Sequence, residues 1–301
     1  MHRRAYTYAA IAVLFWATVA SAFKISLRYL DFLQLLFYAS LVSTAALFLI
    51  VFIQRKLYLL SRYSGKQYIH SMMLGFLNPF LYYVVLFKAY SLLPAQEAQP
   101  LNWTWPITLS VLSIPLLKQR MSLGSFLALC ISFSGVFIIS TRGNIMDFRF
   151  TNPLGVLLAI GSSIVWALFW IFNVRDQRDE VVKLLLNFAF GSIFILITIT
   201  FFSSIKFSDM RGVFGATYVG LFEMGITFVV WLKALQFSKT TARVSNVIYV
   251  TPFFSLIVIY FVLGERILPS SIVGLVLIVT GVIIQQHSSR SHPTSAPVPK
   301  S

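Results

Sequence analysis

The stretch LNWTWP, residues 101–106, lies inside an apolar run of membrane-span length and contains residues that such runs normally lack. Pro106 cannot donate a backbone hydrogen bond, so it frees the carbonyl of Asn102 four residues earlier. A later run carries Pro252 at the same place, and there the freed carbonyl belongs to Ile248. In lipid, such a carbonyl must be satisfied by protein or by water in a cavity. The two prolines therefore predict two loosened membrane helices beside a polar cavity.

The composition predicts an all-α, polytopic membrane protein. Of 301 residues, 58% are hydrophobic and 11% are charged, against roughly a quarter charged in a soluble domain. A membrane helix needs about 20 consecutive apolar residues. Ten such runs can be counted, joined by short connections: 5–23, 32–53, 68–90, 96–117, 121–140, 151–173, 182–203, 213–235, 241–263 and 268–286.

The net charge of +15 reflects orientation in the membrane, because most Lys and Arg residues flank apolar runs. With the amino terminus in the cytoplasm, the inner segments hold an excess of these residues of about two to one. We therefore expect a multi-pass protein of the inner (plasma) membrane with both termini cytoplasmic. The polar, Pro- and Ser-rich tail 287–301 is predicted to be disordered. No basic stripe interleaved with aromatic residues occurs, so nucleic acid is not an expected partner.

The two halves of the chain match at a nearly constant offset of 145–150 residues. The matching positions are Trp16-Ala17 with Trp166-Ala167, Lys88-Ala89 with Lys233-Ala234, Pro106 with Pro252, Arg120 with Arg266, and Gly135-Val136 with Gly281-Val282. A repeat of five spans is odd, so the second copy enters the membrane with opposite orientation. The prediction is two inverted five-helix repeats, 1–145 and 146–286, with a substrate site near the midplane.

The segments LNWTWP at 101–106, Trp166-Ala167, and IYVTPFFSLIVIYFVLGE at 248–265 resemble bacterial amino acid exporters. These are EamA-type members of the drug/metabolite transporter superfamily. The resemblance covers nearly the whole chain to about residue 286, and it implies ten helices and transport without a cofactor. The superfamily carries amino acids, nucleotide sugars, phosphorylated metabolites and drugs on one scaffold, so the substrate stays open. We expect a monomer that binds a small molecule and contacts membrane lipids.

The candidate substrate contacts begin with the face formed by Gln99, Asn102, Trp103 and Pro106, which share a three-to-four spacing. Tyr249, three residues before Pro252, is the symmetry partner of Trp103 and predicts an aromatic on each side of one pocket. Trp105 is expected to point elsewhere. The alternative is that these polar residues only satisfy contacts between helices.

A second group of candidate contacts centres on Asn78 and Glu223, which correspond at an offset of 145. Glu223 is the only acid deep in a span, where an ionised carboxylate costs about 3 kcal/mol or more. It should therefore face the interior, protonated or paired, and it is a candidate for proton coupling; a neutral Glu bonded to a neighbouring helix is the alternative. The group is completed by Tyr82, Trp16 and Trp166.

Two further features bear on the class of function. Lys88 and Lys233 are symmetric cations that could bind a phosphate, but both lie near span ends, where long side chains reach the headgroups. Three of the four histidines lie in the termini, and His70 has no acid near it in the sequence, which argues against an enzyme. We therefore expect an exporter of amino acids, aromatic or bulky and apolar, that works by alternating access. The alternatives are a carrier of phosphorylated metabolites or drugs, or a protein resembling a lipid flippase.

Overall fold

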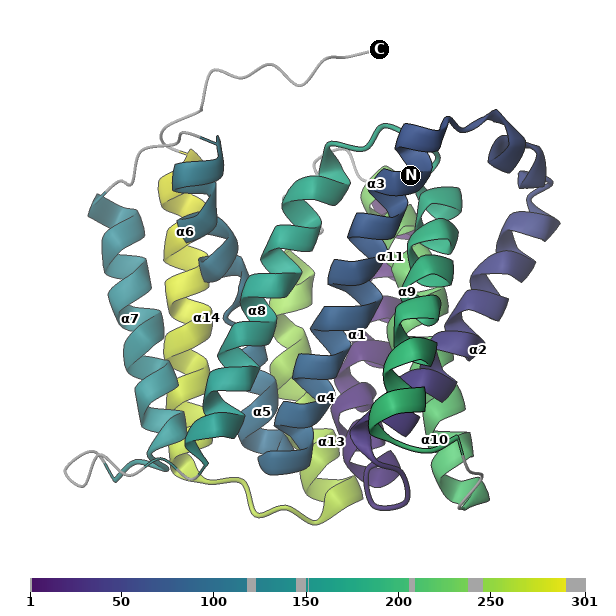
Figure 1. Ribbon diagram of the computed structural model, residues 1–301. Coiled ribbons are helices and arrows are strands. Elements are labelled where there is room, and N and C mark those ends of the chain that lie inside the picture. The colour runs from purple at the N-terminus through teal and green to yellow at the C-terminus, as the bar shows by residue number, and fades with distance from the viewer. Residues whose placement is uncertain are drawn as a thin grey trace.

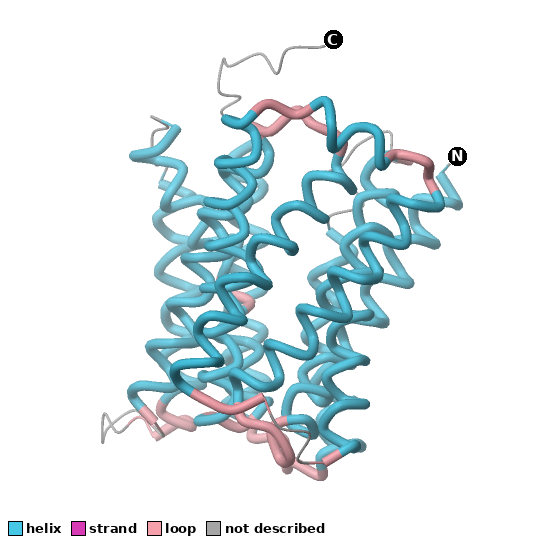
Figure 2. Tube along the Cα trace, turned by 45° about the vertical axis from the view of Figure 1, so that its right-hand side comes forward, coloured by secondary structure: helices cyan, strands magenta, loops and turns pink. Residues whose placement is uncertain are grey.

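The computed structural model describes residues 2–117, 123–144, 150, 152–205, 209–237 and 246–290. Within these ranges all regular structure is helical, and the long helices run roughly side by side as one bundle (Figure 1). Helix α1 begins and α14 ends at the same end of the bundle, which we call the terminal end; the opposite end is the distal end. The loops gather at these two ends (Figure 2).

The helices of the first half are α1 His2–Ser26, α2 Phe32–Ile53, η1 Leu57–Arg62, α3 Gly65–Gly75, η2 Phe76–Leu81, α4 Tyr82–Leu92, α5 Ala95–Asn102, α6 Trp105–Leu117 and α7 Leu123–Ser140. Those of the second half are α8 Pro153–Val174, α9 Glu180–Phe202, α10 Met210–Val219, η3 Gly220–Gly225, α11 Ile226–Gln236, η4 Asn246–Val250, α13 Thr251–Leu263 and α14 Pro269–Arg290.

Within the described part of the chain, seven helical segments are long and apolar enough to cross a membrane, and two shorter apolar helices accompany them. This agrees with a polytopic membrane protein, whereas the count of ten spans and their inverted relation stay predictions. The predicted span 96–117 is two helices, α5 and α6, with a turn at Trp103 and Thr104. The predicted tail begins too early, because α14 continues to Arg290; residues 291–301 lie outside the described ranges.

Local sequence signals begin the helices where the connections end. Asp31 precedes α2, and its side chain accepts hydrogen bonds from the backbone N–H groups of Leu33 and Gln34, at 2.8 and 2.9 Å. Gln34 bonds back to the N–H of Asp31, which completes a capping box. Asp179 caps α9 in the same position of the second half.

Helical geometry is interrupted at matching places in the two halves. In the first half, η2 separates α3 from α4, and Asn78 before Pro79 has extended backbone angles, φ −148° and ψ 120°. In the second half, η3 separates α10 from α11 and contains Glu223. Such wide turns inside helices are frequent at functional sites, because they free backbone groups and redirect side chains.

Glycines let helices of the two halves approach closely. A Cβ added to Gly75 would lie 2.3 Å from the carbonyl oxygen of Asn187 on α9, and one added to Gly220 would lie 2.5 Å from that of Ala39 on α2. On α7, a Cβ at Gly135 would lie 2.5 Å from the carbonyl oxygen of Gly274 on α14. Small residues at helix crossings are a usual basis of packing in membranes.

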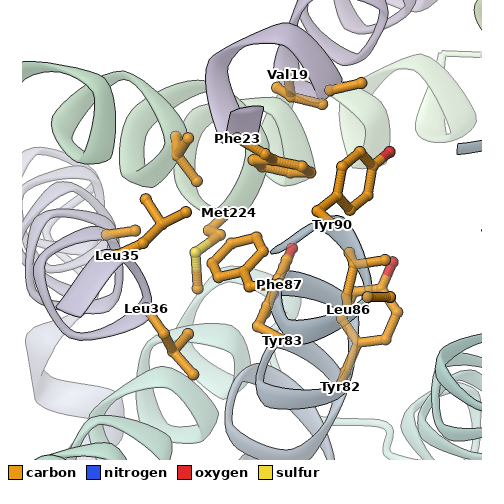
Figure 3. Close-up of a cluster of buried hydrophobic side chains, with 14 of the residues drawn as sticks. Val19, Phe23, Leu35, Leu36, Tyr82, Tyr83, Leu86, Phe87, Tyr90 and Met224 are labelled. Atoms are coloured by element: carbon orange, nitrogen blue, oxygen red, sulfur yellow. The ribbon is translucent and has the colours of Figure 1, made fainter. Parts of the chain in front are cut away.

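The largest buried cluster joins α1, α2, α4 and η3 (Figure 3). Phe23 of α1 packs against Phe87 of α4 at 4.8 Å between ring centroids, and Met224 of η3 lies beside Phe87. This cluster fixes the elements that carry the cavity described next.

Candidate functional site

A cavity of about 70 Å³ lies at the interruptions in the middle of the bundle. Its walls come from α1, α4, the α5–α6 turn, α8, η3 and η4, so both halves of the chain contribute. The lining residues are Trp16, Val19, Phe23, Tyr82, Leu86, Tyr90, Gln99, Asn102, Trp103, Trp105, Trp166, Glu223 and Ile248. We call this the central cavity. Typical small-molecule sites occupy roughly 300–1,000 Å³, so the walls must move apart before a metabolite can enter.

The central cavity brings together most of the residues singled out from the sequence. Those among its lining are Trp16, Tyr82, Gln99, Asn102, Trp103, Trp166 and Glu223. Those not among its lining are Asn78, Pro106, Tyr249 and Pro252. Their roles in binding stay predictions, and the geometry gives them different surroundings.

The structure places two aromatic residues differently from the expected geometry, and the role of Tyr249 in binding stays a prediction. Trp105 lines the cavity, because the turn at Trp103 and Thr104 begins a new helix and changes the direction in which Trp105 points. Tyr249 does not line the cavity; its hydroxyl receives a hydrogen bond from Gln286 on α14, and Ile248 lines the cavity instead. Tyr249 lies in a 3₁₀ segment, whose three residues per turn change which side faces inward.

Asn78 and the two prolines shape the surroundings of the cavity. Asn78 is fully buried, and in the described structure neither atom of its side-chain amide has a hydrogen-bond partner. Pro106 and Pro252 occupy the first turns of α6 and α13, where a missing N–H costs no helical hydrogen bond. The prolines thus begin new helices, whereas the sequence predicted kinks within continuous ones.

A chain of polar side chains crosses one wall. The Tyr82 hydroxyl donates to Oδ1 of Asn102 over 3.4 Å, and the amide Nδ2 of Asn102 donates to the hydroxyl of Ser162 on α8 over 2.8 Å. One turn along, Thr108 and Ser163 are joined at 2.8 Å. These contacts hold the end of α5 and the start of α6 against α8. The side chain of Asn102 is therefore fixed at the cavity edge.

Glu223 is the acid of the central cavity and is only 7% exposed. Its Oε1 accepts a hydrogen bond from the hydroxyl of Tyr83 over 3.1 Å. Tyr83 is fully buried on α4 and is not among the lining residues of the cavity; Figure 3 shows its ring among other buried side chains. The sequence did not single out Tyr83 as a partner of Glu223.

Aromatic rings form most of the remaining wall. Tyr82 packs on Trp166 at 4.7 Å between centroids, and Trp16 packs on Trp231 at 5.7 Å. The apolar lining residues Val19, Phe23, Leu86, Tyr90 and Ile248 were missed, because nothing distinguishes them from other apolar residues in the same runs. Helical spacing could have found two sets: 16, 19 and 23 on α1, and 82, 86 and 90 on α4.

Polar contacts tie α1 and the start of α5 to neighbouring elements at the distal end, below the cavity. Lys24 on α1 donates to the carbonyl oxygens of Tyr90 and Leu93, each at 2.9 Å. The carboxylate of Glu265, in the connection between α13 and α14, accepts from the N–H groups of Ala95 and Gln96 at 3.0 and 3.2 Å. It therefore caps α5 from the other half of the chain, at the positive end of the helix dipole.

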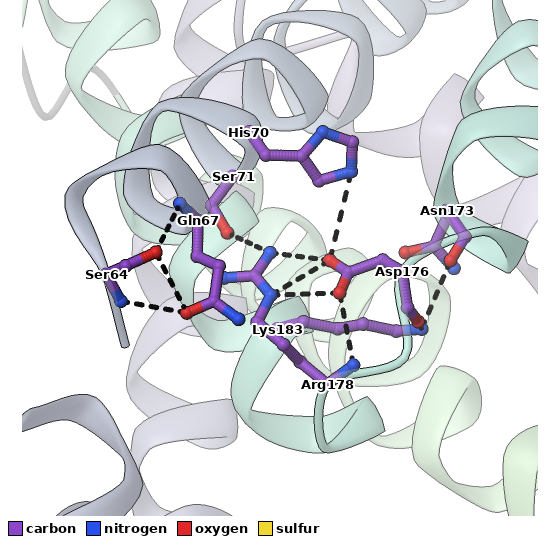
Figure 4. Close-up of polar contacts among 8 residues, drawn as sticks. All are labelled: Ser64, Gln67, His70, Ser71, Asn173, Asp176, Arg178 and Lys183. Carbon is purple, nitrogen blue, oxygen red and sulfur yellow. Dashed lines mark hydrogen bonds and ion pairs between the residues drawn. The ribbon is translucent and has the colours of Figure 1, made fainter. Parts of the chain in front are cut away.

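A second polar cluster ties the halves together at the terminal end (Figure 4). Arg178 and Asp176, in the α8–α9 connection, form an ion pair at 2.5 Å, and Arg178 also donates to Ser71 on α3 over 2.8 Å. Burial alone would raise the pKa of Asp176, but hydrogen bonds from Arg178 outweigh it and lower that pKa. His70 lies 3.9 Å from Asp176, so the expectation that it has no acid nearby is wrong in three dimensions.

A larger cavity, of about 340 Å³, lies between α6, α7 and α8 and is lined mainly by apolar side chains. Phe133 and Ile164, two of its lining residues, are 60% and 42% exposed, so it opens to the side of the bundle. Its hydroxyls are already engaged; that of Ser132, for example, donates to the carbonyl of Ile278 over 3.3 Å. It offers a ligand little polar recognition, so the central cavity is the better candidate site.

Charge separates the substrate alternatives. Among the described lining residues of the central cavity, Glu223 has an acidic side chain, and none of the others is Lys, Arg or His. Lys88 lies 5.0 Å from the ring of Phe32, and Lys233 lies 6.0 Å from that of Tyr8; neither lines the cavity. A phosphate in the central cavity would therefore meet a carboxyl group and no cation.

Comparisons with known proteins agree with a membrane transporter. The family described as "EamA-like transporter family" matches residues 3–141 and again residues 153–285. An uncharacterized transporter of Archaeoglobus fulgidus is 25% identical over 94% of this chain and 98% of its own length. The uncharacterized transporter YvbV of Bacillus subtilis is 25% identical over 73% of this chain and 72% of its own. One crystal structure superposes with a TM-score of 0.66 at 18% identity, over 97% of this chain and 99% of its own, which indicates a shared fold.

Proposed function

The chain belongs to the EamA-like transporter family, and from that premise we propose that it is a secondary active transporter that exports a small amphipathic metabolite. The observation that carries the proposal is the central cavity, which lies at helix interruptions and takes side chains from both halves. Transporters commonly bind substrate near the midplane, at discontinuous helices between repeats. Alternating access follows when the two halves move relative to each other around this cavity.

The proposed architecture is ten helices in two inverted repeats, with boundaries at 1–145 and 146–286. Two observations support it. The family matches the chain twice, over most of each half. Glycine contacts also recur between the halves: Gly75 approaches Asn187 as Gly220 approaches Ala39. The corresponding positions differ by 145 and 148 residues, close to the offsets in the sequence.

The proposed substrate is an amino acid with an aromatic or bulky apolar side chain. Aromatic residues make up seven of the thirteen lining residues: Trp16, Phe23, Tyr82, Tyr90, Trp103, Trp105 and Trp166. Flat rings of this kind suit an apolar group, and Trp and Tyr add a polar edge. The carboxyl of Glu223 suits an amine, and the amide of Gln99 suits the substrate carboxylate, whereas the Asn102 amide already bonds to Tyr82 and Ser162.

A second candidate substrate, an organic amine without a carboxylate, is favoured by the charge of the lining. Glu223 has no cationic counterpart among the described lining residues, and aromatic faces attract cations. The same observation disfavours phosphorylated metabolites. The larger, mainly apolar cavity between α6, α7 and α8 is the feature that favours a flippase-like activity. Its hydroxyls, however, are already hydrogen-bonded and give a lipid headgroup few polar contacts.

Three further parts of the proposal concern energy and placement. Glu223 carries protons, which supplies the driving force for export. The protein lies in the plasma membrane with both termini in the cytoplasm, so the distal end faces outward. The proposed functional unit is a monomer, in which both halves of one chain line the central cavity.

The test is uptake into proteoliposomes at symmetric pH, with L-phenylalanine inside and labelled L-phenylalanine outside. We expect saturable counterflow, weakened by W103A because it removes a wall of the cavity. W170A serves as a control, because Trp170 packs against Trp166 from outside the lining. Absence of counterflow with a panel of amino acids would refute the amino acid proposal.

The same proteoliposomes distinguish the second candidate. Binding of phenethylamine, which lacks the carboxylate of phenylalanine, is followed by quenching of tryptophan fluorescence. Tighter binding of the amine than of L-phenylalanine would favour an amine substrate. For proton coupling, E223Q should abolish uptake driven by a pH gradient, whereas counterflow should continue at a reduced rate because Gln keeps an acceptor oxygen for the substrate amine. Equal loss of both would contradict the proton-coupling role.

A further inference from the structure

We propose that Tyr83 is a positioning residue for Glu223: its hydroxyl holds Oε1 of the carboxyl group, so that Oε2 is the oxygen offered to a proton or a substrate amine. The inference rests on the proposed role of Glu223 in the central cavity. It adds a residue that lies outside the cavity and acts through another side chain.

The first observation is the geometry of the pair. The Tyr83 hydroxyl lies 3.1 Å from Oε1 of Glu223, and the two residues are 140 positions apart, one in each half of the chain. Tyr83 is 0% exposed and Glu223 is 7% exposed, so water does not compete strongly for this hydrogen bond. In a site of low dielectric, a hydrogen bond is electrostatically stronger than in water.

The second observation is that packing fixes the ring of Tyr83. It contacts the ring of Phe87 at 5.2 Å and that of Tyr82 at 4.7 Å, and Figure 3 shows it among the buried side chains of α4. A hydroxyl on an immobilised ring can hold its acceptor in one orientation. Glu223 itself belongs to η3, a wide helical turn of the kind found frequently at functional sites.

The third observation is the contrast between the two adjacent tyrosines. Tyr82 lines the cavity and its hydroxyl bonds to Asn102, whereas Tyr83 is not among the lining residues and its hydroxyl bonds to Glu223. Tyr83 is thus available to Glu223 whether the cavity is empty or occupied. A substrate would contact Tyr82 but not Tyr83.

Other titratable groups near Glu223 have other positions or partners. From α4, the phenols of Tyr82 and Tyr90 line the cavity with it. From α10, the hydroxyl of Tyr218 lies 2.7 Å from that of Thr18 on α1. Among residues whose side chains the structure describes, the elements packed on η3 carry these further titratable groups: Arg4, Tyr6, Tyr8 and Lys24 on α1, Tyr38 on α2, Arg211 on α10 and Lys233 on α11.

The chemistry is consistent in both protonation states. When Glu223 is ionised, Oε1 accepts the Tyr83 hydrogen bond, and Oε2 is free to accept from an amine. When a proton arrives from the cavity, it binds Oε2, and Oε1 continues to accept as the carbonyl oxygen. Tyr83 keeps its own proton throughout. It therefore orients the proton-binding atom without taking part in the transfer.

Infrared spectroscopy of the full-length protein in liposomes tests the inference without a substrate. The carboxyl band that appears on acidification and is absent from E223Q belongs to Glu223. In Y83F we expect this band to move to higher wavenumber, because the carbonyl oxygen loses its donor. Y218F is the matched control: it removes a tyrosine hydroxyl bonded between α10 and α1, five residues before Glu223, and should leave the band unchanged.

Transport supplies the second measurement, with L-phenylalanine as the probe. In Y83F, uptake driven by a pH gradient should fall about fivefold, the change that loss of one hydrogen bond of about 1 kcal/mol produces. Counterflow at symmetric pH should stay within about twofold, a change below 0.5 kcal/mol, and Y83F/E223Q should match E223Q alone.

The outcomes separate the two proposals. An unchanged Glu223 band in Y83F overturns the positioning role, whatever transport shows. A shifted band together with a fall in driven uptake supports it. If the Glu223 band shifts in Y83F but the wild-type protein transports none of the panel of amino acids, the positioning role is supported and the proposed substrate is refuted.

Discussion

Replacing Glu265 by Ala tests whether the distal end holds α5 in place. The Glu265 carboxylate accepts from the N–H groups of Ala95 and Gln96 at 3.0 and 3.2 Å, and these are the first two residues of α5. Loss of a helix cap costs about 0.5–2 kcal/mol. Both acceptor oxygens belong to one charged carboxylate, which lies in the other half of the chain. We therefore expect the loss of this cap to destabilise α5 by about 1–2 kcal/mol, near the upper end of that range.

Hydrogen–deuterium exchange measures this effect locally. A cost of about 1–2 kcal/mol raises the population of an opened α5 roughly 5- to 30-fold. Exchange through local opening rises by the same factor. The peptide covering residues 95–102 should therefore exchange faster in E265A, and E265Q should give an intermediate rate because its amide keeps one acceptor oxygen.

The matched control is D209A. Asp209 caps α10 through the N–H of Arg211 at 2.8 Å, within its own helix. It should speed exchange near residue 210 and leave the peptide 95–102 unchanged. Equal exchange of that peptide in wild type, E265Q and E265A would refute the view that the second half of the chain secures α5.

Two further predictions concern stability. D176N should lower stability at neutral pH by about 2–3 kcal/mol, somewhat below the range for breaking a buried pair because Asp176 lies in a connection. Since Arg178 lowers the pKa of Asp176, this stabilisation is present above the ordinary carboxyl pKa of about 4 and is lost as pH falls through the lowered value; thermal unfolding of both proteins between neutral and acidic pH should converge. G135A should destabilise by about 1–3 kcal/mol, because its Cβ would lie 2.5 Å from the carbonyl oxygen of Gly274, whereas G161A meets nothing within 4 Å and should not destabilise; equal melting temperatures for the two would contradict the close contact.

The sequence was sufficient to predict the class of fold and much of the cavity. Long apolar runs identify membrane helices directly, because backbone groups in lipid must be bonded within the helix. Polar and aromatic residues such as Asn102, Trp103 and Glu223 could be singled out because an apolar run makes them conspicuous. Val19 and Leu86 also line the cavity, but they could not be singled out because they are apolar like their neighbours in the sequence.

The remaining errors arise where a helix changes direction. The position of Trp105 was predicted from the phase of one continuous helix, and the turn at Trp103 and Thr104 resets that phase. Tyr249 was equated with Trp103 through the repeat, but a 3₁₀ segment precedes α13 where α5 is α-helical. Contacts between distant segments, such as Tyr83 with Glu223 or His70 with Asp176, have no signal in a single sequence.

The turn at Trp103 and Thr104 also bears on how the protein could change under selection. It separates α5, which Glu265 and Gln96 tie to the connection before α14, from α6, which Thr108 ties to α8. This turn, between two helices that are anchored separately, is thus part of the cavity wall that contacts the substrate. A substitution at Trp103 that alters which molecules fit would also alter how freely the turn bends. Specificity and turnover should therefore vary together at this position, and a variant with a new preference would need a second change elsewhere to recover its speed.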